Sequence, residues 1–348
     1  MGGTSAPPDA QFSTATLLSE SPEGLIVVVD GRERRLHIFD SFGKHLARVG
    51  RHGGGPAEFE IISGIGFLAD TIYVIDFGNR RTSLLSRDGQ ELARVRYEPD
   101  GPVRSTTGLR AAFPEVLLRD STALGKARAP REAVQRGTIT HEPVLRMTRS
   151  GKVVDTVVWT KTHANAPMRG AGGSSIAQPF EDATLIAISP RIGRSILVER
   201  RAATSSSARR FSVASISPAG DTLFNRSYEY APQRLTTDML QKAIAPLLEA
   251  GRKAGYAESE ILAAVKKPSF LPPVSRVVAG ADGSVWLERS ASGSAMARWW
   301  ILKRDGSLAG SVDMPGHLKI LFARENRVWT VDAETFELPV VIKYEIRR

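Results

Sequence analysis

The sequence predicts an all-β protein built from repeated four-stranded antiparallel units. Residues 25–49 and 71–95 repeat each other at a constant offset of 46 residues. Each copy contains a β-branched run, an alternating run and a glycine turn, which is the pattern of paired antiparallel strands. Convincing helical periodicity is confined to one segment, residues 235–267. The repeat, the strand-like runs and the confined helix together indicate the fold class.

The composition is that of an ordinary globular chain. Its 348 residues suffice for a large core, and 42 % hydrophobic with 24 % charged residues excludes wholesale disorder. The absence of cysteine excludes disulfides, thiolate metal sites and cysteine nucleophiles. No apolar run approaches the ~18 residues that a membrane span needs. The first residues lack the basic start and apolar core of a signal peptide.

The repeat aligns an Asp and an Arg in each copy, beside four consecutive identical residues. We expect the Asp, at the end of one strand, to face the Arg of the next strand and to tie the unit together. A role in ligand binding is the alternative. The residues are Asp30 and Arg34 in the first copy, and Asp76 and Arg80 in the second.

Four antiparallel strands in 46 residues make a unit of the size of one β-propeller blade. In the two clear blades the first strand is expected at residues 12–18 and 61–68. We predict six four-stranded blades in a single domain, residues 11–348, preceded by a flexible segment, residues 1–10. The strands expected in the later blades are 108–112, 116–119, 144–148 and 153–159 in blade 3; 183–188, 195–200, 210–216 and 222–228 in blade 4; 274–279, 284–288, 298–303 and 308–313 in blade 5; and 318–323, 328–331 and 339–346 in blade 6.

Several stretches resemble a known group of propellers. Residues 74–81, followed by Arg87-Asp88-Gly89, are similar to the NHL repeat. Residues 50–59 resemble the blade-to-blade linker of the bacterial six-bladed β-propeller proteins related to NHL-repeat proteins, and so do residues 271–273 and 282–287. The resemblance implies a binding or scaffold role and a location outside the cytoplasm, including the periphery of a membrane.

This chain departs from the family in its N-terminal region. The family normally carries an export signal and a further N-terminal strand that completes the last blade. Here about ten residues precede the first expected strand, and the expected sixth blade has three strands. A late recorded start, processing and a different ring closure are the alternatives, and without a signal peptide a cytoplasmic location stays open.

Three insertions interrupt the repeat, at residues 121–140, 162–178 and 235–267. Loops carry the specificity of a propeller, so function is sought there. The first insertion is basic and predicts contact with phosphate or lipid headgroups, the alternative being a flexible hairpin tip. The second has the glycine- and serine-rich composition of a flexible linker. The candidate contact residues of the first insertion are Lys126, Arg128 and Arg131.

The third insertion predicts an amphipathic helix that begins after Thr236, followed by a short helix at residues 258–265. Pro246 is expected to kink or split the first helix. Its apolar stripe must be buried. The stripe packs on the propeller itself, or serves as a lid or docking helix for a partner. The candidate partner-binding residues are Met239, Leu240, Ile244 and Leu247.

No recognised catalytic motif supports an enzyme. The six histidines show no metal-binding spacing, and the expected inner strands begin with few carboxylates, Asp182 being the clear one. The sequence favours a non-enzymatic scaffold without a cofactor, presenting its basic loops and helices to a protein partner such as a membrane complex near anionic lipid. The alternatives are a metal-dependent hydrolase, lactonase or lyase with a site in the central channel, and an RNA-binding NHL-like module. The net charge of +10 fits RNA, but 7 % aromatic residues and no recognised RNA-binding motif argue against nucleic acid.

Overall fold

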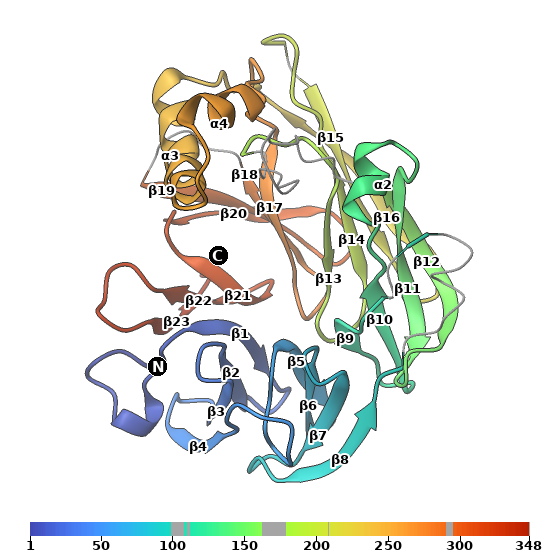
Figure 1. Ribbon diagram of the computed structural model, residues 1–348, viewed down its shortest axis with the longest axis vertical. Helices are drawn as coiled ribbons and strands as arrows, with labels where there is room; N and C mark the ends of the chain where they lie inside the picture. The colour runs from blue at the N-terminus through green and yellow to red at the C-terminus, as the bar shows by residue number, and fades with distance from the viewer. Residues whose placement is uncertain (99–107, 110–111, 162–178, 208, 290–294, 348) are drawn as a thin grey trace.

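The computed structural model confirms a six-bladed β-propeller with a helical insertion before the fifth blade (Figure 1). It describes residues 1–98, 108–109, 112–161, 179–207, 209–289 and 295–347. Each blade is an antiparallel sheet whose strands follow one another in sequence from the ring centre outward. The strands are β1 (Ala15–Glu20), β2 (Ile26–Asp30), β3 (Arg35–Phe39) and β4 (His45–Val49) in blade 1; β5 (Ile62–Leu68), β6 (Thr71–Asp76), β7 (Arg81–Leu85) and β8 (Glu91–Arg96) in blade 2; β9 (Val116–Leu117), β10 (Thr122–Lys126), β11 (His141–Thr148) and β12 (Val153–Lys161) in blade 3; β13 (Leu185–Ile188), β14 (Ser195–Glu199), β15 (Arg209–Ile216) and β16 (Thr222–Tyr230) in blade 4; β17 (Val274–Ala279), β18 (Val285–Arg289), β19 (Met296–Leu302) and β20 (Leu308–Pro315) in blade 5; and β21 (Lys319–Arg324), β22 (Arg327–Asp332) and β23 (Val340–Glu345) in blade 6.

A separate apolar cluster lies between each pair of neighbouring blades in the described part of the chain. Between blades 1 and 2, for example, Val27, Ile38, Phe59 and Ile72 are completely buried. Burial of each such side chain contributes about 1.5–3 kcal/mol. Strands in the middle of a blade face an apolar neighbour on both sides, which explains the β-branched runs of the repeat.

The ring closes between blade 1 and blade 6 through the N-terminal residues. The Met1 amino group donates to the Val341 carbonyl at 2.8 Å, and the Val341 N–H donates to the Met1 carbonyl at 2.8 Å. Gly2 has φ +77° and lies against the Phe12 ring, where any side chain would collide. The first residues of the segment for which the sequence predicts flexibility, residues 1–10, thus bond to the chain at the start of β23, beside a three-stranded sheet.

Blade 3 departs from the strands that the sequence predicts. Its first strand is β9, the segment expected as the second strand, and its second strand is β10, which the sequence analysis placed in an insertion. The residues of β10 read Thr-Ala-Leu-Gly-Lys and have low strand propensity, but pairing with β11 overrides it. Residues 110–111 of the expected first strand and the expected linker 162–178 lie outside the described residues.

The helical insertion forms a hairpin of α3 (Thr237–Lys253) and α4 (Glu258–Ala264). The Thr236 hydroxyl caps α3 by accepting from the Met239 N–H at 3.4 Å. Pro246 does not split the helix. Its ring is exposed, so the carbonyl that loses an N–H donor can be hydrated. A short helix that the sequence did not predict, α2 (Arg131–Gln135), follows β10.

The repeated aspartates bind the main chain of the segment that precedes their blade. Asp76 is fully buried, and its carboxylate accepts N–H donors from residues 60–61 at 3.0–3.2 Å. Asp30 is 1 % exposed and accepts N–H donors from residues 13–14 at 2.5 and 3.2 Å. Each carboxylate thus anchors the incoming chain to the end of the second strand.

The repeated arginines do not face these aspartates as the sequence suggested. Arg34 and Arg80 occupy turns with φ of 54° and 49°. The Arg34 side chain donates to the Glu60 carbonyl at 2.7 Å and so joins blade 1 to the linker of blade 2. The cation near Asp76 is Arg81, whose Nε lies 3.8 Å from the carboxylate. Arg34 and Arg80 do not reach the aspartates because they lie in the turn between the second and third strands, which directs their side chains outward.

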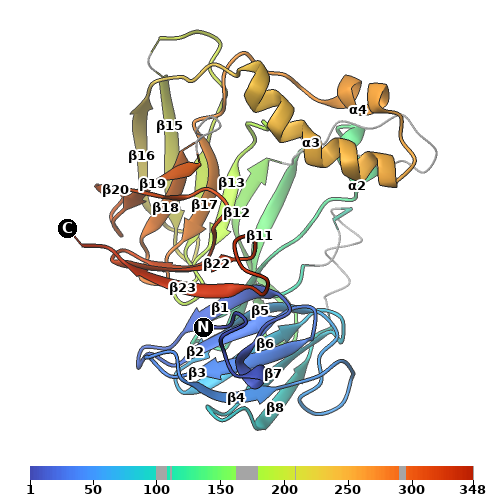
Figure 2. The ribbon, with the colours of Figure 1, turned by 90° about the vertical axis from the view of Figure 1, so that its left-hand side faces the viewer.

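Connections between antiparallel strands alternate between the two faces of the ring. On one face, connections between the strands of the structure have two to six residues. The longer connections all leave the strands on the opposite face, which we call the insertion face. Figure 2 shows α2, α3 and α4 on the same side of the blades. The longer connections that define the insertion face are residues 50–61, 97–115, 127–140, 162–184, 200–208, 231–273 and 333–339, and the six-residue connection 290–295 lies on the same face.

We expect the stability of blade 1 to fall in mild acid because of His37. This side chain is 2 % exposed, lies edge-on to the Phe12 ring at 4.9 Å, and its Nδ1 has no hydrogen-bond partner among the described atoms. Burial, helped by nearby His45, lowers its pKa to about 4. In the unfolded chain the imidazole has a pKa near 6.5, so the unfolded state binds more protons than the folded state between pH 6.5 and 4. The free energy of unfolding should therefore fall by about 2 kcal/mol as the pH drops through this window.

Urea unfolding at pH 7 and pH 4.5 tests this expectation. The variant His37→Leu should lose most of the pH dependence. The matched control His141→Leu changes an exposed histidine and should keep it. Equal pH dependence in the wild type and His37→Leu would contradict the assignment.

Candidate functional site

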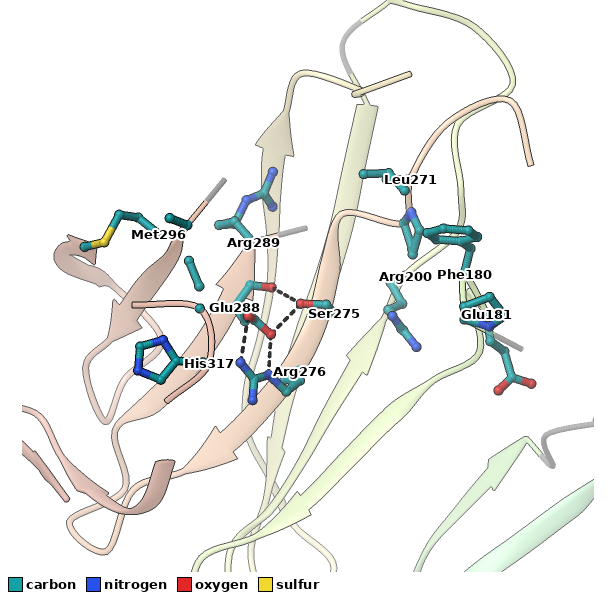
Figure 3. Close-up of a pocket in the computed structure, with 15 residues that line it drawn as sticks. Phe180, Glu181, Arg200, Leu271, Ser275, Arg276, Glu288, Arg289, Met296 and His317 are labelled. Carbon is teal, nitrogen blue, oxygen red and sulfur yellow. Dashed lines mark hydrogen bonds and ion pairs between the residues drawn. The ribbon is translucent and has the colours of Figure 1, made fainter. Parts of the chain in front are cut away.

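A cavity of about 710 Å³ opens on the insertion face between blades 4, 5 and 6 (Figure 3). It is lined by the ends of β14 and β18, the starts of β17 and β19, and the chain before β13 and β21. Its apolar wall includes Phe180, Leu271 and Met296. Its polar lining includes Arg200, Ser275, Arg276, Glu288, Arg289 and His317.

Arg276 and Glu288 form an ion pair in the cavity, and their charges neutralise each other. Arg276 Nε and Nη2 donate to the two oxygens of Glu288 at 2.5 and 2.8 Å, and the Ser275 hydroxyl donates to the same carboxylate at 2.7 Å. These hydrogen bonds raise the pKa of Arg276. A bidentate pair of this kind has little charge left for a ligand.

Arg200 lines the cavity and joins blade 4 to blade 5. It is 8 % exposed, and it donates from Nε to the Ala183 carbonyl at 2.9 Å and from Nη1 to the Val274 carbonyl at 2.5 Å. Burial lowers its pKa to about 10, although Glu181 and a neighbouring aspartate oppose the shift. The guanidinium therefore stays charged at neutral pH.

Arg289 ends β18 and stacks among aromatic rings. Its guanidinium carbon lies 4.4 Å from the Trp300 ring centre, 5.2 Å from that of Phe211 and 5.5 Å from that of Tyr230. Burial lowers its pKa to about 10, so it remains a cation. Its Nη1 is buried without a hydrogen-bond partner among the described atoms, and the group that opposes the lowering of its pKa is Tyr230. In Figure 3 the side chain extends away from the Arg276–Glu288 pair.

His317 lies at the edge of the cavity and is held by blade 6. Its Nε2 is 3.3 Å from the Asp332 carboxylate and 3.3 Å from the Thr335 hydroxyl. Although burial opposes it, hydrogen bonding, chiefly from the Thr335 N–H, lowers the pKa of Asp332 to about 2. Among the residues that the structure describes, no group of three or more His, Cys, Asp and Glu side chains could hold a metal ion. The cavity thus brings three arginines together, of which Arg276 is paired with Glu288.

The predicted basic contacts lie on blade 3, away from this cavity. Lys126 is a strand residue whose ammonium lies 3.1 Å from Glu115, and its side chain is 15 % exposed. Arg128 lies 3.1 Å from Glu142. Arg131 begins α2, but its side chain is outside the described set. Two of the three cations are thus paired within the chain, which leaves less charge for an anionic partner than the sequence suggested.

The predicted helical stripe packs within its own hairpin. Ile244 is 7 % exposed and contacts Ile261 and Val265 near α4. Leu240 and Leu247 are partly buried against the same cluster, and Met239 is half-buried. The stripe therefore fills a small core between α3 and α4, and its role in binding a partner stays a prediction.

The arginines of the cavity were not among the site residues predicted from the sequence. A usable signal was present, because Ser195–Arg200 and Ser284–Arg289 share the pattern Ser-x-x-x-Glu-Arg at the end of the second strand in blades 4 and 5. Comparing these strands would have shown two blades that carry an arginine after this strand's glutamate.

In the described part of the structure, no helix has the length and apolarity to cross a lipid bilayer.

Comparison with known proteins supports the fold. Residues 16–86, which span blade 1 and most of blade 2, match a family described as a 6-bladed beta-propeller. A search of curated proteins found no match. The solved structures that it resembles include a member of the duf4221 family from Bacteroides vulgatus, with a TM-score of 0.50 and 12 % identity over 96 % of this chain and 93 % of that one.

Two further structures are less similar. A putative exported protein from Bacteroides fragilis has a TM-score of 0.46 and 10 % identity over 95 % of this chain and 82 % of that one. A calcium-binding protein, regucalcin, from Agrobacterium tumefaciens has a TM-score of 0.41 and 11 % identity over 97 % and 92 % of the respective chains. The protein is a six-bladed β-propeller, and its first two blades carry the sequence pattern of the family described by that fold.

Proposed function

We propose that the protein is a non-enzymatic binding module that holds a protein partner on its insertion face. The observation that carries this proposal is the asymmetry of the ring, since the long connections leave the described strands on this face while the other face has short turns. Loops on a rigid scaffold can vary without disturbing the blade cores, so such a face suits recognition.

The α3–α4 hairpin is built as an appended unit, which supports the same proposal. The apolar cluster between its helices contains residues of the insertion alone. At its base, Arg234 and Phe270 form an antiparallel bridge, and the Leu235 N–H donates to the Ser269 carbonyl at 3.1 Å. The chain therefore returns to its starting point before it enters blade 5, and the hairpin contributes surface more than ring stability.

Excision of the hairpin tests the proposal. Replacing residues 236–268 with an Asn-Gly turn should leave the propeller folded, because the pairing at its base already brings the two ends together. We expect the wild type to run in an assembly well above 37.8 kDa in lysate or gently solubilised membranes of its own cells. The excised protein should run as a free propeller.

The control is Lys152→Glu, which changes an exposed lysine in a short turn of the opposite face and should leave the assembly intact. A wild type that runs as a free monomer, or an assembly lost equally in the control, would contradict the proposal. The same fractions report whether the protein is outside the cytoplasm or bound to membranes, which are predictions from the family resemblance. The metal-dependent alternative gains no ligand cluster from the described residues, and RNA binding stays a prediction from net charge.

A further inference from the structure

Blade 5 carries a cation at the position where blades 1 and 2 carry a carboxylate. In each of these blades, the first residue of the inner strand pairs with the last residue of the second strand, next to a β-bulge. The register is therefore the same in all three blades. The pairs are Ala15 with Asp30 in blade 1, Ile62 with Asp76 in blade 2, and Val274 with Arg289 in blade 5.

The two residues before the inner strand, which donate N–H groups to the carboxylate in blades 1 and 2, also differ in blade 5. In blades 1 and 2, the carboxylate accepts N–H donors from the two residues before the inner strand. In blade 5 these two residues are Pro272 and Pro273, which have no N–H to donate. Blade 5 therefore lacks both the carboxylate acceptor and the two N–H donors that form the anchor in blades 1 and 2. Arg289 instead lines the 710 Å³ cavity and a neighbouring cavity of about 130 Å³.

We propose that Arg289 binds a carboxylate on a ligand with an apolar body in the cavity between blades 4, 5 and 6. Three aromatic rings surround the guanidinium carbon at 4.4–5.5 Å and hold the cation in place before a ligand arrives. Its Nη1 is buried and has no hydrogen-bond partner among the described atoms. Charge-assisted hydrogen bonds between guanidinium and carboxylate are among the strongest in proteins. Phe180, Leu271 and Met296 provide apolar wall for the rest of the ligand.

The other two arginines of the cavity are less suited to this role. Arg276 is balanced by Glu288 through two hydrogen bonds. Arg200 is nearly buried and already donates to two main-chain carbonyls, so it adds positive charge while its hydrogen bonds join blade 4 to blade 5. Arg289, in contrast, keeps its buried Nη1 without a hydrogen-bond partner among the described atoms. The assignment does not depend on the protein partner proposed above.

Titration of the purified full-length protein with two probes tests the site. The first is 3-phenylpropionate, compared with its neutral amide; the second is the peptide Ala-Ala-Phe with a free C-terminus, compared with the C-terminal amide. Binding is followed by calorimetry and by tryptophan fluorescence, because Trp300 stacks on Arg289. We expect at least one acid to bind at millimolar or lower concentration and its amide to bind about tenfold more weakly or worse. The pair that responds identifies a free small acid or a peptide C-terminus as the source of the carboxylate.

Variants locate the binding. Arg289→Gln should weaken the acid about tenfold or more. Arg298→Gln, which changes an exposed arginine paired with Asp313 in the same blade, should bind as the wild type does. The acid–amide comparison in the wild type keeps the proposal testable even if Arg289→Gln folds poorly. Absence of binding by both acids, equal binding of acid and amide, or unchanged affinity in a folded Arg289→Gln protein would overturn it.

Discussion

Replacing Asp76 with alanine is expected to lower the free energy of unfolding by about 3–5 kcal/mol, the range for removing one member of a buried ion pair. The Asp76 carboxylate is fully buried and accepts hydrogen bonds from the N–H groups of residues 60–61 and from the Asn79 side-chain amide at 2.6 Å. It also forms an ion pair with Arg81, whose Nε lies 3.8 Å away. Without it, buried donors lose their acceptor and Arg81, 6 % exposed, loses its counter-ion. Urea unfolding followed by circular dichroism measures the change.

Asp155→Ala is the matched control, because Asp155 is exposed on β12 of blade 3. It should change the unfolding free energy by less than about 0.5 kcal/mol. A loss at Asp76 no larger than that at Asp155 would mean that the anchor adds nothing to stability. Asp30→Ala should resemble Asp76→Ala, since its carboxylate holds the corresponding segment of blade 1.

The second large effect is expected at Phe12, which packs where the ring closes. Its side chain is 1 % exposed, lies 5.9 Å from the Phe39 ring centre and belongs to the apolar cluster between blades 6 and 1. Phe12→Ala should cost about 3–5 kcal/mol, because it leaves a cavity as well as removing buried apolar surface. Thermal and urea unfolding measure the loss.

Phe42→Ala makes the same chemical change at a side chain that is 95 % exposed, and it should be close to neutral. If Phe12→Ala were as mild as Phe42→Ala, the closure between blades 6 and 1 would contribute little to the stability of the ring. A loss confined to Phe12 would show that the segment before the first strand is part of the folded core.

The fold could be predicted because the strands and turns of most blades are indicated by local sequence patterns. The run Ile26–Asp30 is buried on both sides and is therefore β-branched, while Gly43 and Gly89 mark equivalent turns with positive φ. Blade 3 was misassigned because β10 has weak intrinsic preference and is held by its neighbours. Met1 pairs with Val341, which is 340 positions away, and no local sequence pattern predicts a contact over this separation.

The candidate site was harder to predict because its residues come from three blades. Arg200 and Arg289 look like ordinary surface cations at the end of a strand in the sequence. Their environment depends on the register between strands and on rings such as Trp300 that lie elsewhere in the chain. Conversely, Lys126 belongs to a conspicuous basic stretch, but folding places it beside Glu115. Charge content could be read from the sequence, whereas charge compensation could not.

The hydrogen bonds between Met1 and Val341 also order events during synthesis of the chain. Met1 is synthesised 340 residues before Val341, the residue with which it pairs. At about 5–20 residues per second, the first residues wait roughly 20–70 s for their partner. Throughout that interval the apolar side of blade 1 that will face blade 6 is uncovered, so a newborn chain depends on chaperones or on rapid completion to escape aggregation.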